Sequence, residues 1–182
     1  MFANVRIKGP LEKLFLASGA DLTFASGTHS GRVANVKSAP LAQKLGLKPG
    51  FRILADGAPK DYCEIVGEWP EGAMLVARAS APLDVVHVFA AEAKGLATKL
   101  TRYREAVAPD GMIWVSWPKK TSGVATDLSD VVVRDLALPL GLVDIKVCAI
   151  DEVWSGLKFV IPKEQRSGRS RKAGSGGRAR SS

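Results

Sequence analysis

The sequence has little of what would place it outside the ordinary soluble globular proteins. Two cysteines among 182 residues cannot form a disulfide-rich secreted scaffold. No apolar run approaches the roughly 20 residues that span a bilayer, and the longest early one, residues 14–17, is too short for the core of a signal peptide. Two cysteines and two histidines far apart in the chain argue against zinc. We therefore expect a cytoplasmic protein without a metal and without a membrane partner.

Positive charge is scarce in the middle of the chain and gathers at its ends. Of the net charge of +8, residues 162–182 carry +6, residues 1–37 carry +3 and residues 38–161 carry −1. Residues 162–182 lack aromatic and large aliphatic side chains, so they predict a disordered basic tail. Such a tail predicts weak, non-specific contact with nucleic acid or mere solubilisation, because nothing in it stacks on a base. Residues 1–37 predict a poorly ordered extension, in which 5–8 alternate as in a short strand and 11–15 have the spacing of a short helix.

The middle segment, 38–161, alternates between apolar strands and amphipathic helices. The predicted strands are 51–55, 74–77, 83–89, 112–117, 142–150 and 154–161, and the predicted helices are 41–45, 62–66, 92–107 and 127–138. Long crossovers between strands predict a mostly parallel sheet with helices on both faces. The tight connection at Asp151 and Glu152 predicts an antiparallel strand pair at the end. We therefore expect one α/β domain, a three-layer Rossmann-like sheet that ends as class I methyltransferases do.

Four segments carry a more specific resemblance, residues 40–50, 109–120, 122–128 and 154–158. On them the middle segment, about two thirds of the chain, resembles a small uncharacterised bacterial family, the domain of unknown function numbered 3052. That resemblance implies a fold and brings no established activity. Residues 92–116 also resemble the second half of the class I methyltransferase fold, which implies S-adenosylmethionine as a candidate cofactor.

Two determinants of that cofactor are missing from the sequence. The fold uses a Gly-rich turn after its first strand and an acid at the end of its second strand, which holds the ribose hydroxyls. The first turn here offers only Gly57 after Asp56, and Pro59 removes a backbone donor. Arg78 stands where the acid is expected, and a guanidinium accepts no hydrogen bond. Since 80–83 is also too short for a further helix and strand, we expect a trimmed sheet and no cofactor.

Polar residues nevertheless follow the strands at the edge where open parallel sheets bind ligands. The candidate ligand-binding residues at this edge are Asp56, Gly57, Lys60, Arg78, Trp117, Lys119, Lys120, Thr121 and Ser122. Residues 119–123 are expected to precede a helix N-terminus, where free N–H groups favour a phosphate or carboxylate. The alternative is a solvated loop capped by Thr126.

The remaining reactive residue types fit a core better than a reaction centre. His87 lies inside an apolar strand and predicts a core histidine with one hydrogen bond, because the sequence offers no motif for a triad around it. Cys63 and Cys148 lack a metal or redox spacing and predict small core residues. Trp117 could wall a pocket, and Trp154 could serve a homodimer contact.

The sequence thus favours a methyltransferase-like domain that binds a small anionic or nucleotide-like ligand, or a protein partner, without catalysis. Two alternatives stay open. One is an S-adenosylmethionine-dependent methyltransferase with an atypical cofactor site, and the other is a nucleic-acid-associated accessory protein that acts through its basic tail.

Overall fold

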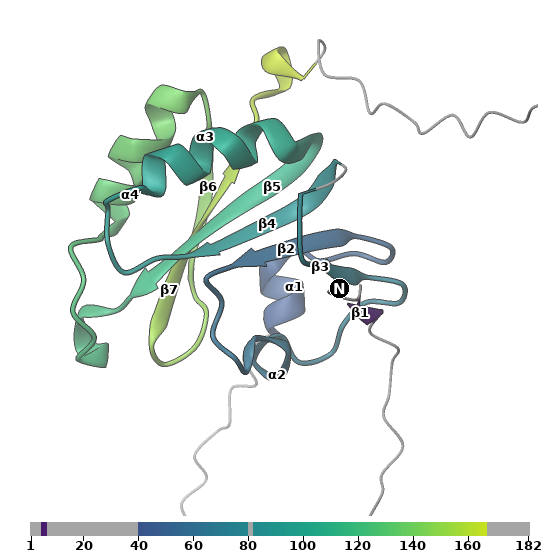
Figure 1. The fold of residues 1–182 in the computed structure, drawn as a ribbon, viewed down its shortest axis with the longest axis horizontal. Helices are drawn as coiled ribbons and strands as arrows, with labels where there is room; N and C mark the ends of the chain where they lie inside the picture. The colour runs from purple at the N-terminus through teal and green to yellow at the C-terminus, as the bar shows by residue number, and fades with distance from the viewer. Residues whose placement is uncertain (1–4, 7–39, 80–81, 167–182) are drawn as a thin grey trace, which may run out of the picture.

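A single sheet runs through the part of the protein that the computed structural model describes, residues 5–6, 40–79 and 82–166. Its strand order is β1-β3-β2-β4-β5-β7-β6 (Figure 1). The strands are β1 (Val5–Arg6), β2 (Arg52–Asp56), β3 (Met74–Val76), β4 (Leu83–Phe89), β5 (Val107–Pro118), β6 (Val143–Ala149) and β7 (Trp154–Val160). Strands β3, β2, β4 and β5 are parallel, and β7 is antiparallel to both β5 and β6. The predicted fold class is confirmed.

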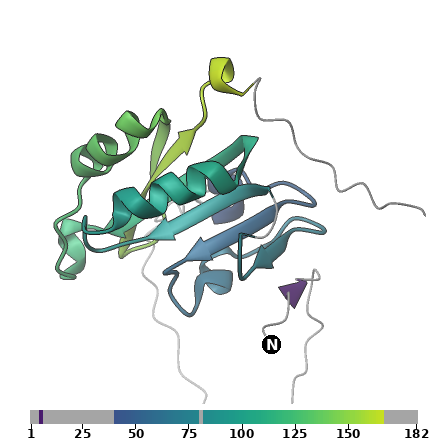
Figure 2. The ribbon, with the colours of Figure 1, turned by 45° about the horizontal axis from the view of Figure 1, so that its top comes forward.

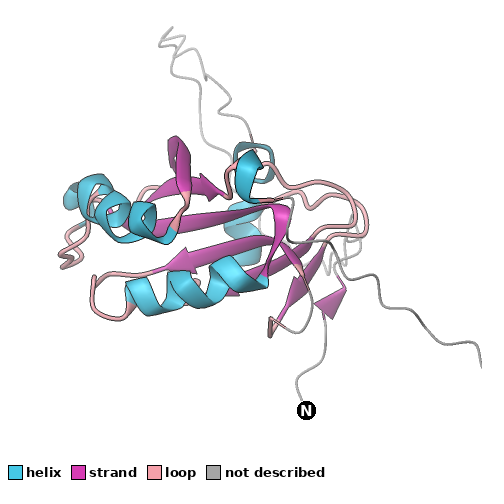
Figure 3. Cartoon of the chain, turned by 90° about the horizontal axis from the view of Figure 1, so that it is seen from above, coloured by secondary structure: helices cyan, strands magenta, loops and turns pink. Residues whose placement is uncertain are grey.

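Helices cover both faces of this sheet. One face carries α1 (Leu41–Leu45) and α2 (Tyr62–Val66), and the other carries α3 (Leu96–Ala106) and α4 (Asp130–Ala137). Short 3₁₀ turns form η1 (Lys120–Ser122), η2 (Leu138–Leu140) and η3 (Lys163–Gln165). Figure 2 shows α3 lying over the sheet, and Figure 3 shows helices on both sides of it.

The central strand β4 is a nearly continuous apolar run in the sequence, and its position in the sheet explains why. All seven of its residues are buried, because it has β2 and β5 on its edges and helices over both faces. Strands covered on both faces are apolar almost throughout. Its one acid, Asp84, accepts a hydrogen bond from the Arg52 backbone N–H at 2.8 Å, so the carboxylate has a polar partner.

The α3 helix is shorter than the sequence predicted. It begins at Leu96 instead of residue 92, directly after Gly95, whose φ is +79°. The turn predicted at residues 109–111 does not separate helix from strand either, because β5 already starts at Val107. Pairing with β4 jumps from Leu83 opposite Val107 to Val85 opposite Met112, so an irregularity in β5 absorbs the predicted turn residues.

The α4 helix also starts later than predicted, at Asp130. Its cap is Ser129, whose side chain accepts a hydrogen bond from the Val132 N–H at 3.3 Å, and not Thr126. The Arg134 guanidinium bridges Asp130 at 2.6 Å and Asp144 of β6 at 2.9 Å, which ties the helix to the edge of the sheet.

The ends of the chain are described only in part. Val5 and Arg6 form the predicted short strand and pair with β3 in antiparallel fashion. At the other end, η3 lies inside the predicted tail, and the Arg166 Nε donates to the Ile161 carbonyl at 2.7 Å. The ordered chain therefore reaches beyond the predicted boundary at 161. The rest of the predicted extension and tail lies outside the described residues.

Packing on the α3 side should make a large contribution to stability. Leu100 is fully buried, so Leu100→Ala should lower the free energy of unfolding by about 2–5 kcal/mol. Ile145→Ala is the matched control, because that side chain is 57% exposed and should change stability by less than about 0.5 kcal/mol. Urea denaturation of the full chain measures both, and equal effects would contradict the assigned core.

Candidate functional site

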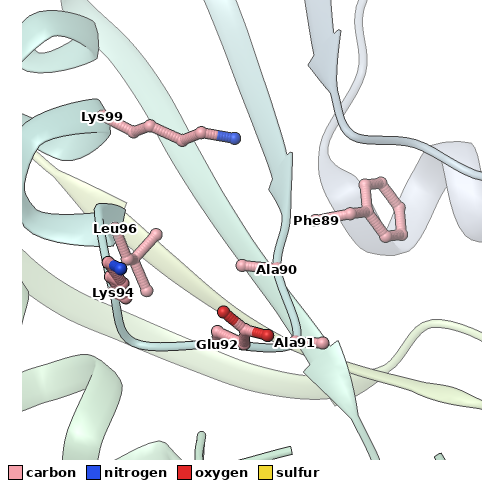
Figure 4. A pocket seen from close by; sticks show the side chains of 7 residues that line it. All are labelled: Phe89, Ala90, Ala91, Glu92, Lys94, Leu96 and Lys99. Atoms are coloured by element: carbon pink, nitrogen blue, oxygen red, sulfur yellow. The ribbon is translucent and has the colours of Figure 1, made fainter.

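The carboxyl ends of β2 and β4 lie side by side and carry the candidate site. Asp56, the last residue of β2, pairs with Val88, one residue before the end of β4. A hollow of about 270 Å³ opens beside this edge. It is lined by the end of β4, the following loop and the start of α3, namely Phe89, Ala90, Ala91, Glu92, Lys94, Leu96 and Lys99 (Figure 4).

Side chains of α3 contact the carboxylate of Asp56. Its carboxylate lies 2.9 Å from the Lys99 ammonium, with 27% of the aspartate and 47% of the lysine side chain exposed. Figure 4 shows Lys99 extending from α3 across the end of β4, while the Phe89 ring points to the other side of the strand. Burial, followed by a hydrogen bond to Asp56, raises the pKa of Tyr103 to about 12. The acid at this edge therefore already has two partners from α3.

Gly57 brings the turn after β2 against the end of β4. Its φ is +68°, and a Cβ at this position would lie 2.7 Å from the Phe89 carbonyl oxygen. Only glycine permits both the left-handed backbone and such an approach. The single glycine of this turn thus serves a close backbone–backbone contact with the end of β4.

The loop that lines the hollow is anchored by the segment before α4. The Thr126 hydroxyl donates to the Ala91 carbonyl at 2.7 Å, and the Asp127 carboxylate accepts from the Ala93 N–H at 2.7 Å. The Ala90 N–H donates to the Ser116 carbonyl at 3.0 Å. These bonds fix the backbone of residues 90–93, which forms part of the lining of the hollow.

None of the nine predicted ligand-binding residues is among those that line this hollow; Asp56 contacts the lining residue Lys99, and Gly57 approaches the backbone of Phe89. Lys60 is exposed in the turn before α2, and Arg78 is exposed just after β3. Trp117 is 7% exposed, belongs to the core under α3 and α4 and is not among the residues that line this hollow.

Residues 119–122 lie at the end of β5, beside the turn between β6 and β7. The Lys119 ammonium donates to the Asp151 carbonyl at 2.6 Å, and the Ser122 hydroxyl donates to the Lys119 carbonyl at 2.7 Å. Lys120, Thr121 and Ser122 form η1, eight positions before α4 begins, so they do not directly precede that helix. Anion binding by these residues stays a prediction.

A buried polar chain crosses the other face of the sheet. The His87 Nδ1 lies 3.0 Å from the Tyr62 hydroxyl, and the His87 Nε2 lies 2.7 Å from the Ser116 hydroxyl. His87 and Ser116 are fully buried, and Tyr62 is 3% exposed. Burial lowers the pKa of His87 to about 3 and raises the pKa of Tyr62, so both side chains are neutral near pH 7.

These two hydrogen bonds correct the expectation for His87 in two respects. The histidine is a core residue as predicted, but it has two hydrogen bonds instead of one, and a serine does lie beside it. Strand alternation and pairing, which set His87 opposite Trp114 and Phe89 opposite Ser116, bring the serine close. Because both groups are buried and the partner of Nδ1 is a phenol, the arrangement serves packing and not a hydrolytic triad.

The cysteines and tryptophans also depart in part from expectation. Cys63 is exposed and Cys148 is partly buried, so Cys63 is not a core residue; both are free thiols. Burial is the main cause that raises the pKa of each. Trp154 packs edge-to-face on Phe89 with ring centroids 5.0 Å apart. Its predicted role in a homodimer stays a prediction.

Sequence reasoning missed Lys99, Glu92 and the anchoring pair Thr126 and Asp127. Lys99 lies on the polar side of α3, and only the fold shows that its ammonium reaches Asp56 at the end of β2. Within the described residues, no cluster of histidine, cysteine or acidic side chains is arranged to hold a metal ion. None of the described helices combines the length and apolar character needed to cross a bilayer.

Comparison with known proteins supports the fold alone. No protein-family model matches the chain, and no curated protein matches it. Among solved structures, it is similar to an S-adenosylmethionine-dependent methyltransferase from Aquifex aeolicus, with a TM-score of 0.51 and 12% identity over 66% of this chain and 88% of the other. It is equally similar to a possible exported protein from Bordetella parapertussis, with a TM-score of 0.51 and 10% identity. That match spans 66% of this chain and 64% of the Bordetella chain.

The domain therefore has a methyltransferase-like α/β fold. Along the chain β4 follows β3 directly, and the described residues between the two strands form no helix or further strand. The short β1 occupies the sheet edge beyond β3, in antiparallel orientation. The expectation of a trimmed methyltransferase sheet stays a prediction.

The approach of Gly57 to Phe89 can be tested by adding one methyl group. In Gly57→Ala the new methyl group meets both a positive φ and the Phe89 oxygen at 2.7 Å. In Gly123→Ala the φ is similar, +74°, but nothing lies within 4 Å of the new methyl group. We expect Gly123→Ala to cost about 1 kcal/mol and Gly57→Ala a further 1–3 kcal/mol or so. Chemical denaturation compares them, and equal losses would contradict the close approach.

The buried histidine predicts a loss of stability in mild acid. An unfolded histidine takes up a proton near pH 6.5, whereas folded His87 does so only near pH 3. Stability is therefore complete above pH 6.5 and falls as the pH drops, by up to about 2 kcal/mol between pH 6.5 and 5. His87→Gln should remove this slope, measured by urea denaturation at several pH values, and His29→Gln should retain it. An unchanged slope in His87→Gln would refute the assignment.

Proposed function

We propose that this domain binds a small anionic or nucleotide-like ligand in the hollow at the end of β4 and does not transfer a methyl group. The observation that carries the proposal is the ion pair between Asp56 and Lys99 at the rim of the hollow. It holds an ammonium at the opening, where a phosphate or carboxylate can share or replace the Asp56 partner. Lys94 adds a second positive charge to the lining and Glu92 a negative one, so the lining residues carry a net charge of +1.

The residues at this edge do not fit S-adenosylmethionine. The turn at Gly57 lies close against Phe89, and Asp56 is held by α3 instead of facing a ribose. Arg78, at the end of the neighbouring strand, has no acceptor for ribose hydroxyls. The hollow, at about 270 Å³, lies below the usual range of roughly 300–1,000 Å³ for ligand pockets. A compact anion suits it better than a full adenosyl cofactor.

Three other inferences from the sequence belong with this proposal and stay predictions. They are membership of the bacterial family numbered 3052, a cytoplasmic location, and binding of a protein partner by the same domain. The two free cysteines are compatible with a reducing compartment.

Calorimetric titration of the full chain with adenosine monophosphate, inorganic phosphate and S-adenosylhomocysteine tests the proposal. We expect the monophosphate or phosphate to bind and S-adenosylhomocysteine to bind more weakly. Lys99→Gln should weaken anion binding about tenfold, because it removes a charge-assisted hydrogen bond. Asp56→Asn should strengthen it, because it frees the ammonium.

Lys163→Gln is the matched control, since Lys163 is exposed in η3, away from the hollow. It should bind as the unaltered chain does. Failure of both anions to bind, or equal binding by Lys99→Gln and the control, would contradict the proposal. Tighter binding of S-adenosylhomocysteine than of the monophosphate would instead favour the methyltransferase alternative.

A further inference from the structure

Four lysines gather on the opposite side of the sheet from Lys99, on the face that α1 covers. They are Lys44 in α1, Lys48 in the turn after it, Lys146 in β6 and Lys158 in β7, and we call them the lysine face. Lys146 and Lys158 are direct cross-strand neighbours. The Lys158 ammonium lies 3.6 Å from where a Cβ on Gly46 would be, so its side chain reaches the end of α1.

The charges of these lysines act on one another. The charges of Lys146 and Lys48 lower the pKa of Lys158, after burial as the largest cause. Those of Lys146 and Lys44 act together on the Cys148 thiol, which lies on the same face. Two stretches far apart in the sequence, 44–48 and 146–158, therefore bring four ammonium groups into one electrostatic neighbourhood.

The arrangement lacks internal compensation within the described residues. Like charges directly opposite across two strands destabilise a sheet. The three ion pairs among the described residues involve other lysine and arginine side chains. The one acid of β6, Asp144, is opposite Phe159 and binds Arg134, so it faces the α4 side of the sheet. No acid of the strand relieves the repulsion between Lys146 and Lys158.

We propose that the lysine face binds the phosphodiester backbone of a nucleic acid. Cross-strand neighbours have Cβ atoms about 5 Å apart, and the flexible lysine arms can reach successive phosphates of one strand. Lysine acts as a point charge that neutralises phosphates without reading bases. Lys48 and Lys146 are exposed, so an extended polyanion has access to the face. This proposal is independent of the ligand at the hollow, which lies on the other side of the sheet.

Binding of a fluorescent 20-base-pair DNA duplex and of an RNA duplex of the same sequence, as a function of salt, tests the proposal. The probes are added to the full chain and to the double variant Lys146→Gln/Lys158→Gln. For DNA, the slope of log K against log salt should become less steep by about 1.8, because each lost phosphate contact contributes about 0.9. A less steep slope for the double variant than for the unaltered chain, with either duplex, supports the proposal.

The matched control is Arg102→Gln/Lys163→Gln, which removes the same charge from exposed positions in α3 and η3. It should keep the slope of the unaltered chain. Equal slopes in the two double variants, or no salt-dependent binding by the unaltered chain, would overturn the proposal. Binding to vesicles with anionic lipid that exceeds binding to both duplexes would overturn it as well. Thermal unfolding of the double variant should show no loss of stability, since the repulsion between the two lysines is removed.

Discussion

The close approach of Gly57 to Phe89 constrains everything at the carboxyl edge of this sheet. Parallel strands deliver their following turns to one edge, and ligands normally enter between two diverging turns. Here the turn after β2 folds onto the end of β4, with a distance of 2.7 Å between a virtual Cβ and the Phe89 oxygen. The hollow at this edge lies beside α3 and is lined by Lys99 and the loop after β4. The methyltransferase-like fold thus carries at this edge a hollow of about 270 Å³ with lysines and one glutamate in its lining.

A second constraint lies on the opposite face, where polar atoms are buried in pairs. The chain from Tyr62 through His87 to Ser116 joins α2, β4 and β5 by two hydrogen bonds. The Trp114 indole N–H donates to the Leu45 carbonyl at 3.1 Å and joins β5 to α1. Buried polar groups that find partners only in one arrangement fix strand register and helix position. The apolar core alone would leave both less determined.

Much of the fold could be predicted because local pattern and global architecture agree. The buried run of β4 and the tight turn before β7 determined fold class and strand direction. The candidate site was less accessible to sequence reasoning, since it depends on contacts across the chain. Asp56 was identified from its place after a strand, but its partner Lys99 lies 43 positions later and looked like a solvated residue. The helix predicted over 127–138 begins later, at Asp130, because Ser129 caps it.

The proposal that S-adenosylmethionine does not fit this edge rests on the approach of Gly57 to Phe89. Backbone amide NMR spectra of the full chain, recorded as S-adenosylhomocysteine is added to millimolar concentration, test it directly at Asp56, Gly57 and Phe89. The close approach predicts that these three signals show no saturable shift. A saturable shift centred on Gly57, with half-saturation well below millimolar, would show that the turn opens to admit the cofactor and would contradict the account.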